Sequence, residues 1–172
     1  GGPARFIGAN TKILDVPSFD YDRHLRSMNE KEESDDSKNV VFLDDGGPFH
    51  RDQFIFNTPF PCTLEEYSSN LNSYFQLIEK MFGYSVVVAG SPRVDYNKIG
   101  NPFEGRRIVQ GETQKWVKNS NFVLSFCSTA VNFAVIYKKP VVILALNPNK
   151  RNDFDPLTQS LASKIGKTPI YW

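Results

Sequence analysis

The amino-acid sequence predicts an α/β fold built on a parallel β-sheet, and two features of the chain support this prediction. Short apolar, β-branched segments alternate along the chain with longer segments in which apolar residues recur at helical spacing. The short segments are apolar throughout, as is typical of parallel strands that helices cover on both faces. Strands that alternate with helices form right-handed βαβ units, which place the strands in one parallel sheet.

The first half of the chain is expected to hold two strands with a long helix between them. Residues 39–43 (NVVFL) are apolar and β-branched, and two aspartates and two glycines follow them as turn residues. Thr63 and Glu66 form the capping-box pattern of a helix start, because the acidic residue stands three positions after the threonine. Apolar residues then recur at helical spacing until Gly83, and the apolar segment 85–89 (SVVVA) is the second strand.

The second half repeats this alternation in shorter segments. We expect strands at 107–109, 122–126 and 140–144, helices at 113–119, 128–137 and 155–165, and a last strand that begins at Pro169. At the amino terminus, residues 5–8 (RFIG) have the pattern of a piece of another strand.

The composition is that of an ordinary globular domain. Hydrophobic residues make up 40% and charged residues 23% of the 172 residues, which excludes a largely disordered chain. The 20 basic and 19 acidic residues leave a formal net charge of +1, which argues against a nucleic-acid-binding protein. Cys62 and Cys127 are too few for a disulfide framework or a zinc site, so a reducing cytoplasmic setting is the simplest interpretation.

We expect residues 1–172 to form a single domain of a longer, two-domain protein. The length suits one hydrophobic core, and both ends cut through segments with the pattern of strands. Residues 29–38 are charged and lack aromatic side chains, which predicts a solvated surface loop, with an acidic interaction segment as the alternative. No apolar run approaches the ~20 residues that a membrane-spanning helix needs.

Ligands of open parallel sheets bind beyond the carboxyl ends of the strands, so the residues that follow each strand are the candidates for function. Ser128 and Thr129 follow the strand at 122–126 and open the expected helix at 128–137. Free backbone N–H groups at a helix start favour an anion, and hydroxyl groups add hydrogen bonds to phosphate oxygens. The alternative is that Ser128 is only a helix N-cap, which is a common role of serine.

A second candidate follows the strand at 85–89, where the chain continues as Gly90, Ser91, Pro92 and Arg93. Gly90 permits a close approach of the backbone, Pro92 stiffens the loop, and the guanidinium of Arg93 can bind a phosphate through two nitrogen atoms. An ordinary surface loop with an exposed arginine is the alternative.

Asp45 and His50 are the candidates for acid–base chemistry. They lie close to Asp44 and Asp52 in the sequence, and a carboxylate and a histidine can act together as a general base and the group that orients it. The alternative is a turn, which aspartate and glycine favour for conformational reasons. No metal is expected, because these residues lack the spacing of a metal site.

Two other side chains are assigned structural roles. His24 is expected at the surface. Cys127 is expected to be a small buried residue at a strand end and not a nucleophile, because the sequence suggests no base partner for it.

Six segments occur in a characteristic order between Ser18 and Trp172. They are DYD (20–22), FLDDGGPFHRD (42–52), SPRVDYN (91–97), FEGRR (103–107), the short helical segment 112–119 and STAVNFAVIYKKPVVIL (128–144). Together they resemble the glycosyltransferases of bacterial capsule and surface-polysaccharide gene clusters, and more distantly the bacterial sialyltransferases and polysialyltransferases. The resemblance implies the carboxyl-terminal, Rossmann-like half of a GT-B enzyme. This half binds the nucleotide-sugar without a metal cofactor, and the glycan acceptor lies mostly on an amino-terminal half that this chain lacks.

The resemblance also implies roles for particular residues. Ser128 and Thr129 match the hydroxyl pair that such enzymes place near the donor phosphate. Ser91 and Pro92 stand where related families have His-Pro, and serine cannot supply the charge of a protonated imidazole, so Arg93 would have to supply it.

The expected activity is the transfer of a sugar from a nucleotide-sugar to a surface glycan. It would take place in the cytoplasm, with peripheral association of the full-length protein at the inner face of the bacterial membrane left open. In this interpretation Gln110, Gly111 and Thr113 line the base or the ribose. Asp45 and His50 act as base and orienting group if the chemistry takes place on this chain.

Two alternatives stay open. A GT-B-type nucleotide-sugar epimerase normally has a carboxylate near the start of the helix that follows 122–126, and this sequence has Ser128 and Thr129 there. A non-catalytic nucleotide-binding or assembly module is favoured by Ser91, which replaces the histidine of the related families.

Overall fold

The structure is a computed structural model. It describes residues 8, 12, 14, 16–28, 38–50, 53, 55, 57, 60–146 and 155–171. The expected strand at 5–8, apart from Gly8, and the expected charged loop at 29–38, apart from Lys38, lie outside the described residues.

A single sheet of six parallel strands forms the centre of the fold, which confirms the predicted α/β class. The strands are β1 (Asn39–Leu43), β2 (Ser85–Ala89), β3 (Ile108–Val109), β4 (Phe122–Ser125), β5 (Val141–Ala145) and β6 (Ile170–Tyr171). Their order across the sheet is β3-β2-β1-β4-β5-β6. This is the strand order of Rossmann-like sheets, in which the direction of the connections reverses between the two central strands.

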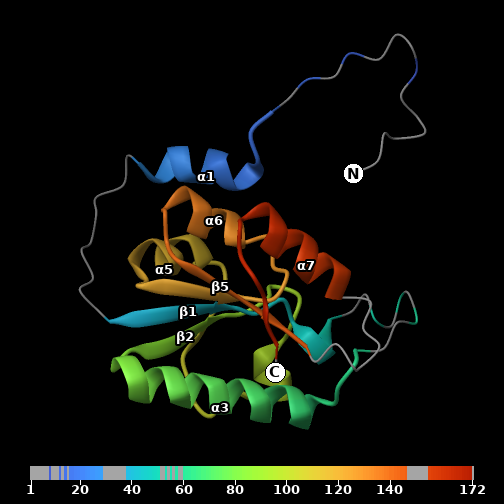
Figure 1. Cartoon of the computed structure of the whole chain (residues 1–172), viewed down its shortest axis with the longest axis vertical. Helices are drawn as coiled ribbons and strands as arrows, with labels where there is room; N and C mark the ends of the chain where they lie inside the picture. Colours follow the sequence, from blue (N-terminus) through green and yellow to red (C-terminus); the bar gives the residue numbers. More distant parts are fainter. Residues whose placement is uncertain are drawn as a thin grey trace.

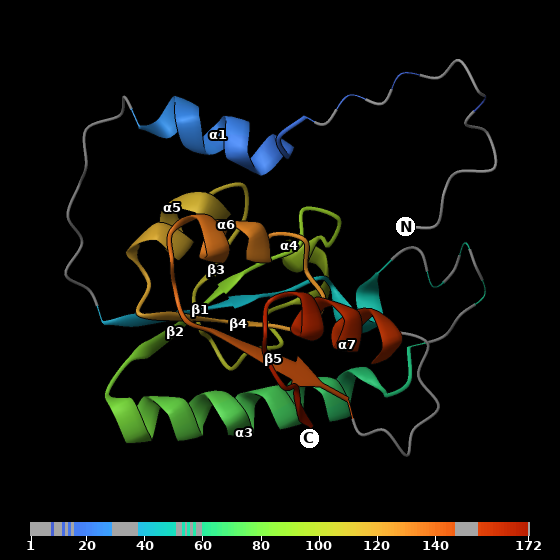
Figure 2. The ribbon, with the colours of Figure 1, turned by 45° about the horizontal axis from the view of Figure 1, so that its top comes forward.

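Helices cover both faces of the sheet (Figures 1 and 2). They are α1 (Phe19–Ser27), the 3-10 helix η1 (Gly47–Phe49), α3 (Leu64–Phe82), α4 (Tyr96–Ile99), α5 (Thr113–Asn119), α6 (Val131–Ile136) and α7 (Asp155–Lys164). On one face α3 packs over a core whose centre is Phe42, with ring centroids 5.2 Å from Phe75 and 5.9 Å from Phe126. On the other face α5, α6 and α7 pack over a second core. No helix in the described ranges is long and apolar enough to cross a membrane.

The long helix α3 begins and ends where the sequence predicts. The side chain of Thr63 accepts a hydrogen bond from the backbone N–H of Glu66, and the Glu66 side chain accepts one from the N–H of Thr63. Gly83 ends the helix in the left-handed conformation that glycine adopts without steric cost.

The predicted helix at 128–137 is shorter in the structure. Residues 128–130 form a turn instead, in which the N–H of Val131 donates to the carbonyl of Ser128 at 3.2 Å. The helix α6 therefore begins at Val131, with Ala130 and not Ser128 as its N-cap residue. The prediction placed the helix start too early, because the hydroxyl of Ser128 contacts the N–H of Ala130, 3.4 Å away, within this turn.

The helix α1, which was not expected from the sequence, lies on the outer side of α5 and α6 (Figures 1 and 2). None of its residues is buried, and it contacts the domain through polar groups. His24 Nδ1 lies 3.2 Å from the Tyr137 hydroxyl, and the Gln114 amide donates to Ser27 Oγ at 2.7 Å. His24 is therefore half-buried against α6 and not simply a surface residue as expected, because its ring also packs edge-on against the Tyr137 ring.

Candidate functional site

A cleft of about 460 Å³ opens at the carboxyl ends of β1 and β4, where the strand order reverses. The segments that follow β1 and β4 leave the sheet in opposite directions at this point, so they leave a crevice between them. Nine of the residues proposed from the sequence line this cleft. They are Asp45, His50, Gly90, Ser91, Pro92, Arg93, Thr113, Ser128 and Thr129.

Asp44, the first residue after β1, is the most deeply buried charged group of the cleft, at 4% exposed. One of its carboxylate oxygens accepts hydrogen bonds from the Tyr67 hydroxyl and the Gly46 N–H, each at 3.0 Å, and the other accepts one from the Tyr96 hydroxyl. Burial, followed by the negative charge of Asp45, raises the pKa of Asp44 from 3.8 to about 6, and the hydrogen bonds limit this rise.

The two tyrosines fit closely against glycines of the neighbouring loops. A Cβ atom at Gly90 would lie 2.7 Å from the Tyr96 ring, and one at Gly47 would lie 2.6 Å from the Tyr67 ring. Only glycine therefore lets both phenols reach Asp44, which explains why a glycine follows each of the strands β1 and β2 so closely.

Asp45 faces the cleft and contacts the segment that follows β4. One carboxylate oxygen accepts the N–H of Gly47 at 3.3 Å, and the other lies 3.3 Å from the Cys127 thiol, which donates to it. Burial and the charge of Asp45 raise the pKa of the Cys127 thiol, so this cysteine stays protonated and is a poor nucleophile.

His50 lies beside Arg93 in the structure. Its Nε2 atom is 3.2 Å from Nη1 of Arg93. Because a guanidinium only donates hydrogen bonds, Nε2 is the acceptor in this contact. Asp45 and His50, proposed as base and orienting group, thus each have a different neighbour, Cys127 for Asp45 and Arg93 for His50.

The turn after β2 places Ser91 and Arg93 at the cleft. Ser91 is buried, its hydroxyl accepts the N–H of Arg93 at 3.3 Å, and its own N–H donates to the Tyr96 hydroxyl at 3.1 Å. Gln110 does not line the cleft; its amide donates to the carbonyls of Ser91 at 2.7 Å and Val94 at 3.0 Å, which holds this turn from behind.

The remaining predicted residues lie on both sides of the reversal point. Ser128, half-buried, and Thr129, exposed, belong to the turn after β4, and Thr113 is the first residue of α5. Gly111 lies outside the cleft, with a positive φ of 79° and no atom near the position of a Cβ. Since α6 has six residues and begins at Val131, this turn brings hydroxyl groups, and not the N-terminus of a long helix, to the cleft.

The structure adds Asp20 and Arg23 of α1 to the cleft. The Arg23 guanidinium lies 6.0 Å from the centre of the Phe133 ring, over the start of α6. The N-cap Ser18, with acidic residues in the first turn after it, was a helix-start signal that could have revealed this segment. In the described part of the chain, no three His, Cys, Asp or Glu side chains gather in a way that could hold a metal ion.

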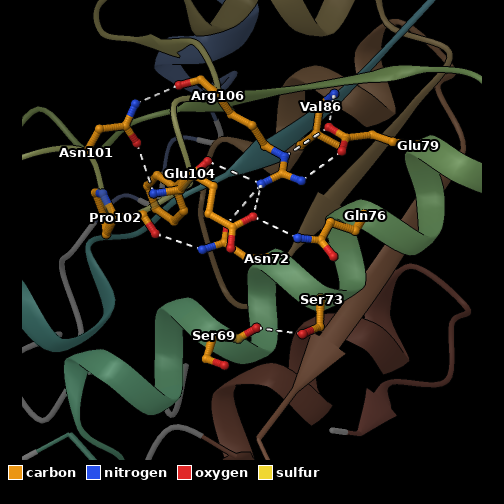
Figure 3. Close-up of polar contacts among 11 residues, drawn as sticks. Ser69, Asn72, Ser73, Gln76, Glu79, Val86, Asn101, Pro102, Glu104 and Arg106 are labelled. Atoms are coloured by element: carbon orange, nitrogen blue, oxygen red, sulfur yellow. Dashed lines mark hydrogen bonds and ion pairs between the residues drawn. The ribbon is translucent and has the colours of Figure 1, made fainter.

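A second hollow, of about 630 Å³, lies at the opposite edge of the sheet, where β1 and β2 begin. Its main charged groups bind each other: Arg106 donates to Glu79 at 2.9 and 2.7 Å and to Asn72 at 3.1 Å (Figure 3). This network joins α3 to the segment before β3, and we assign it a structural role. The smaller cleft at the carboxyl edge is the candidate site, because ligands of such sheets bind there.

Comparison with known proteins adds no family to this description: no protein-family model and no curated protein matches the chain. A Rossmann-like fold supports many unrelated functions, so the fold alone does not assign one. The function has to be argued from the side chains of the cleft between β1 and β4.

Proposed function

We propose that this chain is the donor-binding domain of a glycosyltransferase, which transfers a sugar from a nucleotide-sugar to a surface glycan. The observation that carries the proposal is the convergence of Ser91, Arg93, Ser128 and Thr129 on one cleft at the reversal point of the sheet. These side chains supply the hydroxyl donors and the fixed positive charge that a diphosphate or a phosphodiester requires.

The cleft also suggests how the reaction would proceed. A base takes the proton of an acceptor hydroxyl, the hydroxyl oxygen attacks the anomeric carbon, and the nucleotide leaves with the electrons of the broken C–O bond. Ser91 stands where related families have histidine, so Arg93, which lines the same cleft, would balance the charge on the leaving phosphate. Asp45 is the proposed base if the chemistry takes place on this chain. The proposal also includes a glycan acceptor and a second half of the enzyme.

One observation supports the epimerase alternative. The sequence has no carboxylate at the start of the helix after β4, but the fold brings Asp45, from the loop after β1, within 3.3 Å of the Cys127 thiol, in the segment between β4 and this helix. Incubation with a nucleotide-sugar, followed by NMR, separates the two activities. An epimerase inverts a sugar carbon and keeps the nucleotide attached, whereas a transferase releases the nucleotide when an acceptor is present.

Calorimetric titration with CMP, UDP and GDP tests the proposal directly. We expect one of them to bind the folded domain. The double variant Ser128→Ala/Thr129→Ala should weaken this binding tenfold or more, because each hydrogen bond to a charged phosphate contributes about 1.5–3 kcal/mol. The variant Ser69→Ala/Ser73→Ala is the matched control, since it removes two exposed hydroxyls from α3. A folded domain that binds none of the three nucleotides contradicts the proposal.

A further inference from the structure

Buried hydrogen bonds connect the cleft to the end of β1. The N–H of Ser91 donates to the Tyr96 hydroxyl at 3.1 Å, and this hydroxyl donates to Oδ2 of Asp44. On its other side the carbonyl of Ser91 accepts the Gln110 amide at 2.7 Å. Both backbone polar groups of Ser91 are therefore held by side chains from other elements.

The direction of these hydrogen bonds depends on the ionisation of Asp44. A backbone N–H can only donate, so the Tyr96 oxygen accepts from Ser91 and its single hydrogen points to Asp44. A protonated Asp44 would itself bring a donor to the phenols. If the Tyr96 oxygen accepted a hydrogen bond from the protonated carboxyl of Asp44, the hydrogen of the Tyr96 hydroxyl would turn toward Ser91. Two donors, the Tyr96 O–H and the Ser91 N–H, would then face each other.

The surroundings of Asp44 place its titration in an accessible pH range. The groups that face it or its neighbours are Asp45 and the Gly46 N–H in its own loop, Tyr67 from α3, Tyr96 from α4, Cys127 after β4, and the contacting pair His50 and Arg93 across the cleft. Burial and the charge of Asp45 together raise the pKa of Asp44 to about 6.

We propose that Asp44 is a positioning residue, which holds the Ser91–Arg93 turn through Tyr96 and so makes ligand binding in the cleft depend on pH. Affinity is highest with Asp44 ionised and falls when it is protonated. The identity of the ligand rests on the proposed function, but the connection between Asp44 and Ser91 does not.

The test compares three phenylalanine variants and one amide variant. The probes are UDP-glucose, GDP-mannose and CMP-N-acetylneuraminic acid, whose phosphates are esterified at both ends and so lack the proton of a phosphate monoester that titrates at about pH 6. In the wild type, affinity should rise with pH through the titration of Asp44. Tyr96→Phe and Asp44→Asn should lower the affinity at high pH by about tenfold and remove the pH dependence. Tyr67→Phe should keep the dependence but shift it to higher pH, since Asp44 loses a donor that stabilises its charge. Tyr74→Phe, half-buried on α3 outside this network, should behave as the wild type.

A second readout uses the ligand-free protein. The ¹H–¹⁵N amide resonance of Ser91 should titrate with Asp44 in the wild type, and this titration should be lost in Tyr96→Phe. If none of the three nucleotide-sugars binds, the donor-binding proposal fails, and the amide titration alone decides the positioning role. An amide resonance of Ser91 that does not change with pH in the wild type overturns the inference, as does a Tyr96→Phe variant with wild-type affinity and pH profile.

Discussion

Asp44 and Asp45 follow β1 directly, yet their carboxylates have different surroundings. Asp44 is 4% exposed and accepts hydrogen bonds from the hydroxyls of Tyr67 and Tyr96. Asp45 lies in the wall of the cleft against the Cys127 thiol. Burial of an ionised carboxylate costs free energy that the two phenols offset only in part, and this cost is why the pKa of Asp44 stays raised.

This raised pKa predicts that Asp44→Asn stabilises the protein near neutral pH. The pKa is about 6 in the folded protein against an ordinary value of 3.8, so the folded state binds the proton more tightly than the unfolded chain. The contribution of this group to stability is therefore full below about pH 4 and is lost as the pH rises to about 6. A rise from 3.8 to about 6 corresponds to about 3 kcal/mol, which is the upper limit of the gain at about pH 8.

Urea unfolding of the wild type and of Asp44→Asn at about pH 4 and about pH 8 measures this effect. The difference between the two proteins isolates Asp44 from the other groups that titrate in this range. A variant that is destabilised by the same amount at both pH values would contradict the prediction.

The sequence could place both aspartates after a strand, but it could not show which of them is buried. That difference depends on Tyr67 and Tyr96, which come from helices 23 and 52 positions further along the chain. The neighbour of His50 was equally hidden, because Arg93 reaches it from the turn after another strand. Local patterns predict which residue types follow a strand, whereas the partner of each side chain is set by tertiary packing.

At the scale of secondary-structure elements, the Arg106 network joins α3 to the segment before β3 (Figure 3). The Arg106 guanidinium binds both carboxylate oxygens of Glu79, and its side chain is 10% exposed. We predict that Arg106→Lys lowers the free energy of unfolding by about 1–3 kcal/mol, because an ammonium cannot make this two-point contact. Nucleotide binding should not change, since the network lies at the opposite edge of the sheet from the cleft.

Arg107→Lys is the control for this prediction. The Arg107 guanidinium lies over the Trp116 ring, 4.6 Å from its centre, and the residue is exposed. Such a stacked contact at the surface contributes about 1 kcal/mol or less. Urea unfolding that shows equal losses for the two variants would remove the special role assigned to Arg106.

The sequence predicted some elements better than others for physical reasons. The helix α3 carries a signal at each end, Thr63 with Glu66 and then Gly83, and it buries a continuous apolar face. The helix α1 buries none of its residues, and Leu25 within it and Met28 just after it are exposed. It has a start signal at Ser18 but no glycine to mark its end, so its sequence signals are weaker than those of α3.

At the scale of the whole molecule, the strand order creates the site. Alternation of strands and helices predicts a parallel sheet, but it does not order the strands, since several orders satisfy the same right-handed connections. The reversal between β1 and β4 brings the loops at 44–50, 90–93 and 127–130 to one cleft. The residues that follow the strands meet at one cleft because the carboxyl ends of parallel strands share one edge.

The attachment of α1 to this cleft leads to the last prediction. No residue of α1 is buried. The Gln114 amide donates to Ser27 Oγ of α1 at 2.7 Å and to the hydroxyl of Tyr137, at the end of α6, at 2.8 Å. Because such surface contacts hold α1, its amides should exchange with deuterium much faster than those of α3. Gln114→Ala should speed this exchange further, while Gln159→Ala, on α7, should leave it unchanged. Since α1 also supplies Asp20 and Arg23 to the cleft, a bound nucleotide should slow exchange in α1 selectively. Hydrogen exchange followed by mass spectrometry measures all of these rates. Exchange in α1 as slow as in α3 in the free protein would contradict this prediction, because the surface contacts of α1 would then hold the helix as firmly as a buried apolar face.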